Sequence, residues 1–395
     1  MGIMPPTIPA LDPTAPHLTD VLPSCIAALG GAANRLELRP VDRAVVVLVD
    51  GLGAAALRAN SGHARHLAAR LTKRARIASG FPTTTAAALA SLTTGVSPGT
   101  HGLVGYTAYV PSADAVKNQL TGWGPTMQPD TWQAQPTLFE QASAAGIGCS
   151  AIGAPRYTSS GFTHAVLRGA HYVAGKSIAD RFAAARAVLD SAAARSSKAL
   201  VYVYIPELDM AAHASGWQSD KFTAALETVD AETEAFALRL RQGEGMLLTA
   251  DHGMLDIPAT SHVLFDENPA LVRGVAHVAG DPRCLQLHVA GGSGPKEAER
   301  QAVIAELLAA WREAEGERAW VLSGDEAVEA GWFGAVLPGI RSRIGDVIVA
   351  ARKNIAYYDS RTTPAAKRTM IGQHGSWSDD ELYVPLLGFG AFERP

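Results

Sequence analysis

The sequence predicts an α/β fold, with a doubly wound, mostly parallel central sheet flanked by helices and a small α+β insertion. Short apolar runs rich in β-branched residues alternate with alanine-rich helical stretches along most of the chain. Each run is continuously apolar, as expected when helices cover both faces of a parallel sheet. Strand–helix alternation of this kind is typical of doubly wound folds.

The expected strands of this sheet are four apolar runs, at residues 45–49, 200–205, 246–249 and 347–349. Helical apolar patterns lie between them, at residues 178–194 and 220–240. Residues 1–18 are rich in proline, which predicts an extended N-terminal lead-in.

One part of the chain has a different texture. Within residues 261–345 there is a strand-like run at 284–289, followed by a Gly-Gly-Ser-Gly turn and a charged amphipathic helix at 295–314. We therefore expect residues 261–345 to form the α+β insertion. Residues 19–260 and 346–395 would together form the main α/β domain.

The composition limits the classes of partner. The 395 residues carry a formal net charge of -4, with no basic excess. Polymeric nucleic acid needs clustered Lys and Arg, so stable nucleic-acid binding is not expected, whereas a small phosphorylated molecule is compatible. Neither a secretory signal nor an apolar run long enough to span a bilayer is visible, which predicts a cytoplasmic protein. The three scattered cysteines are expected to be buried and unpaired, and the oligomeric state is left open.

Acidic side chains follow three of the expected strands. Asp50 comes directly after the first, Asp209 a few residues after the second, and Asp251 just after the third. Ligands of open parallel sheets bind beyond the carboxyl ends of the strands, so these groups should converge there. Three carboxylates in one place repel one another unless a cation lies between them.

Histidines accompany these acids. Asp209 and His213 are spaced to lie on one face of a helical turn, which suits a borderline ion such as Zn²⁺. His252 follows Asp251, and Gly253 would let the backbone turn sharply there. His374 lies in the glycine-flanked segment GQHGS. Each residue alone is explained as well by a helix cap or a chance spacing, but the combination favours a metal site.

Three consecutive threonines, residues 83–85, precede an alanine-rich helical stretch. A hydroxyl at this point is ordinarily an N-cap. The N-terminus of a helix also favours a phosphoryl group. A metal-bound hydroxyl there could act as a nucleophile near neutral pH.

These motifs resemble the alkaline phosphatase superfamily, and within it the nucleotide pyrophosphatase/phosphodiesterase branch (type I phosphodiesterases). The resemblance extends from residue 45 to about residue 387 and rests on VVVLVDGLG, FPTTTAAALASLTTGVSPGTHG, YIPELDMAAHASG, LLTADHGM and GQHGS. It implies an alkaline phosphatase-like catalytic domain. It also implies hydrolysis of phosphate diesters or nucleotide pyrophosphate bonds through a covalent phospho-threonine.

Two Zn²⁺ ions are implied as cofactors, although other divalent cations are possible. One ion would be held by Asp209, His213 and His374. The other would be held by Asp50, Asp251 and His252, with the nucleophile as a further ligand. The second threonine of the family's P-T-x-T pattern is the nucleophile, which places it at Thr85, with Thr84 as the alternative. Ala86, Ala87 and Ala88 follow, so a side-chain donor to the phosphate must come from elsewhere.

The substrate pocket is less defined by the sequence. Tyr106 and Tyr157 are candidates to stack on a base or an aryl group, as are Tyr109 and Trp123, although any one of them could be an ordinary core or surface aromatic. A phosphomonoesterase of the same superfamily is the nearest alternative. A sulfatase is not expected, because a C-x-P-x-R motif is missing.

A more distant alternative is an NAD(P)-binding Rossmann protein. The segment GLGAAA at residues 51–56 matches the glycine fingerprint after a strand. An acidic residue about 20 positions further on should bind the ribose. Residues 51–113 contain no Asp or Glu, which counts against this alternative.

Overall fold

The computed structural model describes residues 7–191, 197–291 and 297–393, and it confirms the mixed α/β fold with a mostly parallel central sheet. The sheet has seven strands in the order β2-β17-β8-β1-β7-β5-β6. Their bounds are β1 Arg43–Val49, β2 Arg76–Ala78, β5 Gly148–Gly153, β6 His171–Ala174, β7 Ala199–Ile205, β8 Glu244–Thr249 and β17 Tyr383–Gly390. β17 is antiparallel to both its neighbours, and the strands from β8 to β6 are parallel.

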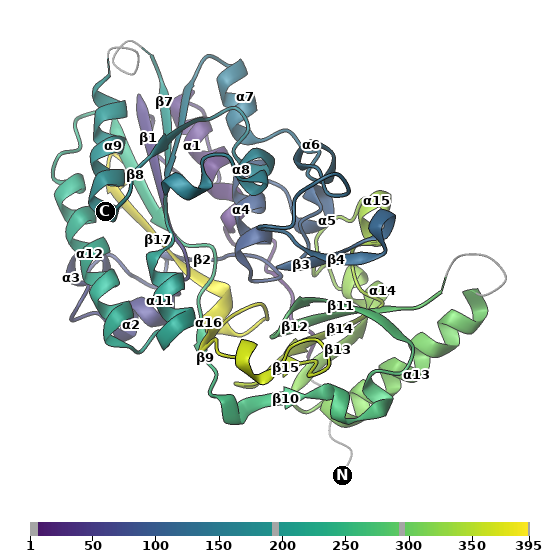
Figure 1. Cartoon of the computed structure of the whole chain (residues 1–395). Coiled ribbons are helices and arrows are strands. Elements are labelled where there is room, and N and C mark those ends of the chain that lie inside the picture. Colours follow the sequence, from purple (N-terminus) through teal and green to yellow (C-terminus); the bar gives the residue numbers. More distant parts are fainter. Residues whose placement is uncertain (1–6, 192–196, 292–296, 394–395) are drawn as a thin grey trace.

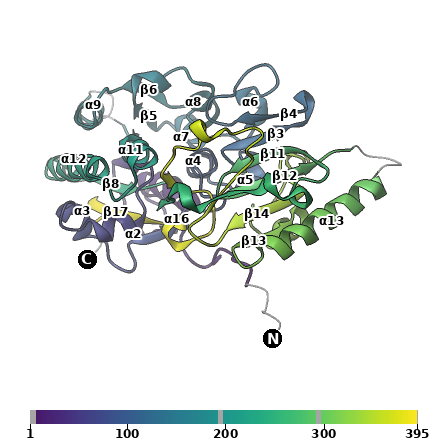
Figure 2. The same ribbon diagram turned by 60° about the horizontal axis from the view of Figure 1, so that its bottom comes forward.

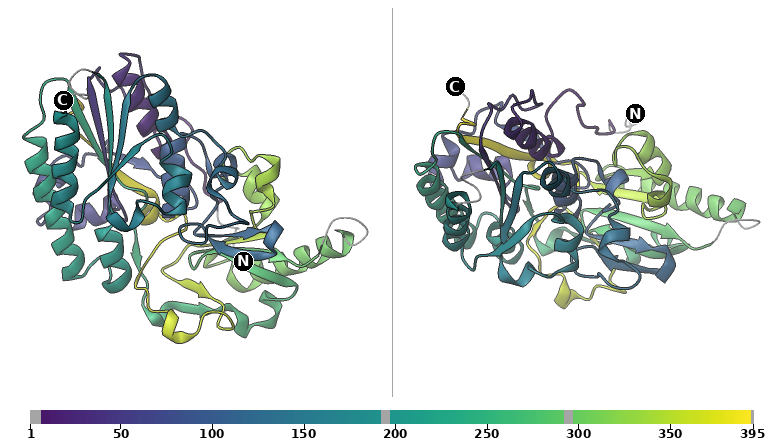
Figure 3. Two further views of the ribbon diagram at one scale, coloured as in Figure 1. Left: turned by 45° about the horizontal axis from the view of Figure 1, so that its top comes forward. Right: turned by 90° about the horizontal axis from the view of Figure 1, so that it is seen from above.

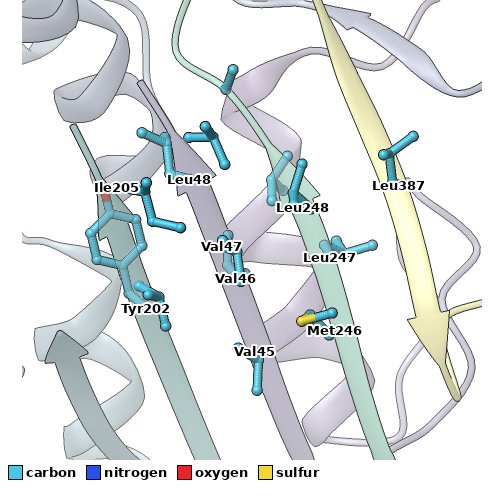
Figure 4. Close-up of a cluster of buried hydrophobic side chains, with 14 of the residues drawn as sticks. Val45, Val46, Val47, Leu48, Tyr202, Ile205, Met246, Leu247, Leu248 and Leu387 are labelled. Atoms are coloured by element: carbon cyan, nitrogen blue, oxygen red, sulfur yellow. The ribbon is translucent and has the colours of Figure 1, made fainter. Parts of the chain in front are cut away.

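Helices cover both faces of this sheet, as the continuous apolar strands required (Figure 3). One face carries α1 Val21–Leu29, α4 Thr85–Thr94 and α7 Leu138–Ala144. The other carries α2 Ala54–Ala59, α3 Arg65–Ala68, α9 Ile178–Asp190, α11 Glu207–Ser215 and α12 Asp220–Ala237. The main core therefore lies around β1, between β7 and β8, where Val45, Leu48 and Met246 are fully buried (Figure 4).

The second sheet is antiparallel and has six strands, in the order β13-β14-β12-β11-β3-β4. Their bounds are β3 Thr107–Val110, β4 Ala115–Asn118, β11 Val275–Asp281, β12 Cys284–Val289, β13 Ala319–Ser323 and β14 Val347–Ala351. α13 Glu297–Glu315 packs on this sheet and extends away from the main body (Figures 1 and 2). Only part of the sheet comes from residues 261–345, since β3, β4 and β14 lie outside that range.

The strand expected at 347–349 was assigned to the wrong sheet. It forms β14, which is antiparallel to both β12 and β13. Its side chains alternate between two cores: Val347 and Val349 face the cluster under α13, whereas Ile348 and Ala350 face the cluster beneath Phe81 and Trp377. Both faces are buried, so the run is continuously apolar although the sheet is antiparallel.

Short elements complete the fold. The remaining helices are α5 Pro98–His101, α6 Pro129–Trp132, α8 Gly161–Val166, α14 Gly324–Glu329, α15 Pro338–Arg341 and α16 Asp379–Leu382. Two small sheets pair β9 Leu255–Asp256 with β16 Gly372–Gln373, and β10 His262–Leu264 with β15 Ala356–Tyr358. In the N-terminal lead-in, the Thr7 carbonyl accepts a hydrogen bond from Trp320 of β13, and the Pro9 carbonyl accepts one from Trp332, which follows α14. No helix within the described ranges is long and apolar enough to cross a bilayer.

Candidate metal centre and nucleophile

The three strand-end acids do converge at the carboxyl edge of the main sheet. Asp50 follows β1, Asp209 lies in the first turn of α11 after β7, and Asp251 follows β8. His252 Nε2 is 3.5 Å from Asp50 Oδ1 and 3.4 Å from Asp251 Oδ2. One potential ligand atom from each of these three residues lies within 4.8 Å of the others.

A second group adjoins the first. Candidate ligand atoms of Asp209, His252 and His374 also lie within 4.8 Å of one another. Asp209 Oδ1 is 3.2 Å from His213 Nε2 and 3.9 Å from His374 Nε2. The structure therefore brings all six expected Asp and His residues together. It also places His252, which the resemblance assigned to one ion, between the two groups, with its ring stacked on His374 at 3.6 Å between centroids.

The carboxylates of this cluster lack hydrogen-bond donors where they face one another. Asp50 Oδ1, Asp209 Oδ1 and Asp251 Oδ2 are all buried without a hydrogen-bond partner among the described residues. Burial, and then the charge of Asp251, raises the pKa of Asp50 well above its ordinary value. Burial also raises the pKa of Asp251. Buried carboxylate oxygens without donors are costly, so this donor set fits divalent cations.

Backbone carbonyls orient all three imidazoles in the same way. The Nδ1 atoms of His213, His252 and His374 lie 2.7, 3.2 and 2.8 Å from the carbonyl oxygens of Gly372, Gly253 and Thr83. A carbonyl can only accept, so each Nδ1 carries the hydrogen. Each Nε2 therefore directs its lone pair toward the carboxylates, which is the arrangement that metal-ligating histidines show.

Electrostatics inside the cluster favour neutral histidine at His374. Burial, and then the nearby imidazoles of His252 and His213, lowers the pKa of His374 well below its ordinary value. Asp209 differs from the other acids: burial acts to raise its pKa, but the positive charges of the neighbouring imidazoles in their protonated form outweigh burial and lower it to about 2. Burial acts to lower the pKa of His213, but the charge of Asp209 outweighs burial and raises it. A metal ligates ionised carboxylates and neutral imidazoles, so a cation bound here would take the place of the protons that these imidazoles carry.

Thr85 is the first residue of α4, and its hydroxyl reaches the cluster. Thr85 Oγ1 lies 3.2 Å from His252 Nε2. Thr84, at the N-cap position, makes no side-chain cap and instead faces Asp281. Thr83 fastens the His374 loop, since its hydroxyl donates to the Ser376 carbonyl at 2.7 Å and accepts from the Gly375 N–H at 3.1 Å. Among the three threonines, the geometry favours Thr85 as the reactive hydroxyl.

Gly253 is required for a different reason from the one expected. It does not adopt a left-handed conformation. A Cβ atom there would lie 1.9 Å from the Asp380 carbonyl oxygen and 2.8 Å from Gly53 Cα. A side chain at position 253 would therefore clash with the neighbouring loops, which meet directly behind His252, and this lack of space explains why the residue is glycine.

Two contacts of the cluster were not expected from the sequence. The Tyr204 hydroxyl donates to Asp50 Oδ2. Asp281, at the end of β11, lies close to the His374 loop, where a Cβ on Gly375 would approach the Asp281 Cβ to 2.9 Å. Burial raises the pKa of Asp281 to about 7. Tyr204 is the first residue of the YIPELDMAAHASG motif, but no local pattern indicated its contact with Asp50, and Asp281 stands in none of the motifs.

Two cavities of about 550 Å³ each meet at the cluster. The first is walled largely by apolar and aromatic side chains, including Trp123, Tyr157, Phe162 and Tyr172. The second opens between the two sheets and is lined by Tyr106, Asp281 and Lys367, among others. Thr85, Asp209 and Leu120 line both cavities.

Three of the four aromatic candidates therefore border the cluster: Tyr157 and Trp123 in the first cavity, and Tyr106 in the second. Tyr109 does not. It lies on the second sheet between His277 and His288, with ring centroids 4.9 Å from each.

The glycines of the Rossmann-like fingerprint pack closely against other loops of the protein. A Cβ on Gly51 would lie 3.0 Å from Asp209 Cα, and one on Gly53 would lie 2.9 Å from Gly253 Cα. Gly51 N–H donates to Asp251. These glycines permit the metal-site loops to pack closely, which counts against the NAD(P)-binding alternative.

The mixed α/β fold and the Asp/His cluster together are those of the alkaline phosphatase superfamily. Residues 44–377 match the family described as type I phosphodiesterase / nucleotide pyrophosphatase. The chain belongs to this family, and it is a hydrolase of the phosphodiesterase/nucleotide pyrophosphatase type.

Solved structures show the same fold. Murine ectonucleotide pyrophosphatase/phosphodiesterase 5 superposes with a TM-score of 0.65 at 15% identity, covering 88% of each chain. An inactive threonine-to-alanine variant of that protein in complex with AMP gives the same values. The human protein gives 0.65 at 16% identity, covering 89% of this chain and 90% of that one. No curated protein sequence matches the chain.

Proposed function

We propose that this protein is a two-zinc hydrolase of phosphate diesters or nucleotide pyrophosphate bonds that acts through a covalent intermediate on Thr85. The observation that carries the proposal is the convergence of the Thr85 hydroxyl with buried carboxylate oxygens that have no hydrogen-bond donors. Membership of the family gives the reaction class, which is phosphodiester or pyrophosphate hydrolysis. The convergence supports a metal-assisted reaction with Thr85 as the nucleophile.

Asp209, His213 and His374 would hold one ion, and Asp50, Asp251 and His252 the other, with Thr85 as a further ligand. The bound ions would lower the pKa of the Thr85 hydroxyl and stabilise charge on the attacking and leaving oxygens. The Nε2 lone pairs and the unpartnered carboxylate oxygens are the donors that such ions need.

Thr85 would attack phosphorus in line. Its oxygen forms the new P–O bond as the bond to the leaving group breaks, and water later hydrolyses the phospho-threonine. Thr85 begins a ten-residue helix, so N–H groups of the first turn of α4 are available to the phosphoryl oxygens. Backbone donors of this kind compensate for the apolar side chains of Ala86 to Ala88.

The two cavities favour a diester over a monoester. A diester carries two organic groups on one phosphorus, and the two cavities meet at Thr85 and Asp209. The first cavity suits a ring, because its wall is mostly aromatic and apolar. The second offers Lys367 to a charged leaving group such as a phosphate. The AMP complex of the murine relative is consistent with a nucleotide as the retained group.

One set of assays tests the proposal. The zinc-loaded protein should turn over bis-p-nitrophenyl phosphate and a p-nitrophenyl nucleotide ester faster than p-nitrophenyl phosphate. Thr85→Ala should lose about a thousandfold or more in kcat while retaining its metal. Thr84→Ala is the matched control and should change kcat little. A marked preference for the monoester would show a phosphomonoesterase instead, and wild-type turnover by Thr85→Ala would exclude the covalent mechanism.

A further inference from the structure

The first cavity contains a single cationic side chain among the described residues, that of Arg156. Arg156 lies in the 3-10 turn Pro155–Tyr157, which follows β5 at the same sheet edge as the metal cluster. The acids that line this cavity are Asp50 and Asp209, and both belong to the cluster. The outer part of the cavity therefore presents a positive charge with no acid beside it.

The contacts of the Arg156 guanidinium leave that charge uncompensated. Its Nη2 donates to the Tyr157 hydroxyl oxygen at 3.0 Å and contacts Met210 Sδ at 3.0 Å. Its Cζ lies 4.8 Å from the centre of the Tyr157 ring. No carboxylate of the described residues lies within 4.0 Å of it. A hydroxyl and a thioether are weak acceptors, so most of the five N–H donors of this arginine are available to a ligand.

Three other arginines of the main α/β part differ in this respect. Arg168 pairs with Glu140 at 3.4 Å, and Arg181, behind the sheet edge, pairs with Glu207. Arg186 pairs with Glu244 at 2.7 Å. Each of these cations has a carboxylate within the fold, whereas Arg156 does not.

A continuous row of contacts leads from the metal cluster to Arg156. The Tyr204 hydroxyl donates to Asp50, and the Tyr204 ring meets the Tyr157 ring edge-on at 5.9 Å between centroids. The Tyr157 ring in turn lies beneath the Arg156 guanidinium. A ligand with its phosphorus at the cluster and its organic group along these two rings would bring its far end to Arg156.

We propose that Arg156 binds a second anionic group at the far end of the organic part of the substrate, and so selects esters that are charged at both ends. The inference rests on the proposed function. Its recognition chemistry is a phosphate, phosphonate or carboxylate, whose paired oxygens match the planar guanidinium fork.

Matched synthetic diesters test this proposal. Each carries p-nitrophenol as one group and, as the other, a phenyl or biphenyl ring that ends in hydrogen, a carboxylate or a methylphosphonate. In Arg156→Ala, kcat/KM for the two anionic series should fall about tenfold to a hundredfold, mainly through KM, since a hydrogen bond to a charged group contributes about 1.5–3 kcal/mol. The neutral series should change less than about twofold. The carboxylate and phosphonate arms distinguish the two kinds of anion.

Two further variants sharpen the result. Arg156→Lys keeps the charge but not the fork, and should lose less than Arg156→Ala. Arg65→Ala removes an exposed arginine that lines neither cavity and should leave every series unchanged. Equal losses for neutral and anionic diesters would overturn the role of Arg156, because they would show that its side chain only shapes the cavity wall. No loss for either series would also overturn it, because the side chain would then be solvated and bind no part of the substrate. Failure of the wild-type protein to cleave any of the diesters would instead overturn the proposed function.

Discussion

Tyr204 connects the wall of the first cavity to the metal cluster through one hydrogen bond. Its hydroxyl donates to Asp50, and burial, followed by the charge of Asp50, raises its pKa well above the ordinary value, so it stays a donor. Groups that orient metal-binding carboxylates are worth about 10- to 100-fold in metal affinity. Tyr204 is therefore expected to fix which oxygen of Asp50 faces the ion.

Tyr204→Phe should weaken zinc binding by about tenfold or more, measured by competition with a chromogenic chelator. Tyr202→Phe is the control, because Tyr202 lies on the same face of β7, is buried more deeply than Tyr204, and its hydroxyl has no partner in the described part of the chain. Equal affinities for the two variants would mean that the hydrogen bond to Asp50 does not orient the ligand.

Asp281 makes the stability of the metal-free protein depend on pH. Burial raises its folded-state pKa to about 7 from an ordinary value of 3.8. The folded state therefore keeps a proton that the unfolded chain releases, and stability falls as pH rises from about 4 to 7. Above pH 7 both states are ionised, and the cost of burying the charged carboxylate reduces the free energy of unfolding by its maximum.

Asp281→Asn should raise the free energy of unfolding at pH 8 by about 2 kcal/mol or more, and the gain should shrink toward pH 5. Denaturant unfolding with a chelator present measures both values. A variant less stable than the wild type at pH 8 would show that the surroundings of Asp281 stabilise its charge.

At the level of elements, a buried ion pair joins the turn between β11 and β12 of the second sheet to α16 and the His374 loop. Arg283 and Glu381 are both fully buried and form two hydrogen bonds, of 2.8 and 2.6 Å. Arg283 also donates to the carbonyls of Lys353 and Ile355, and Glu381 accepts from the Ser376 N–H. The pair therefore holds the segment that follows His374 against the second sheet.

Arg283→Met alone should destabilise the protein by about 3–5 kcal/mol, because Glu381 would be left buried and unpaired. Adding Glu381→Leu should recover part of that loss. The exposed pair of Arg312 and Glu326 is the control, and Arg312→Met should cost about 1 kcal/mol or less. Denaturant unfolding of the four proteins measures these values, and a small effect of Arg283→Met would show that the loop is held by its other contacts.

The elements also show what local patterns can predict. The runs at 45–49, 200–205 and 246–249 became β1, β7 and β8, since continuous apolar runs reflect burial on both faces. The run at 347–349 has the same pattern but joined the second sheet as β14. Periodicity reports burial and not the neighbouring strand, so it could not separate these cases.

For the molecule as a whole, bound metal should be a main source of stability. The acids around the site raise one another's cost of ionisation, as the raised pKa values of Asp50 and Asp251 show. An ion that binds only the folded state stabilises it by about 2.7 kcal/mol at a concentration 100 times its Kd. Bound metal should therefore offset the repulsion among these carboxylates and stabilise the folded state.

Zinc should raise Tm relative to chelated protein at pH 8, with two ions bound per chain by mass spectrometry of the native protein. Asp50→Asn should increase the Tm of the chelated protein, because it removes one buried charge, and should lose most of the response to zinc. If zinc left the wild-type Tm unchanged, the Asp/His cluster would not be a metal site.

The sequence by itself determined the parallel sheet and the residues that form the site. Asp50 and Asp251 directly follow apolar strands, and the Asp209–His213 spacing lies within one helical turn, so their placement depends on neighbours a few residues away. The flanking glycines of GQHGS drew attention to His374, but its assignment to one ion with Asp209 and His213 came only from the family resemblance, because nothing local links His374 to the strand ends.

Only the tertiary structure decided the surroundings of that site. The second sheet pairs Thr107 with Gly280, residues far apart in the chain, and this pairing brings Asp281 to the His374 loop. Tyr204 and Arg156 likewise acquire their roles from contacts with Asp50 and with an acid-free cavity wall. Such contacts depend on how separate segments pack, and packing between distant segments leaves no periodic pattern in the sequence of either one.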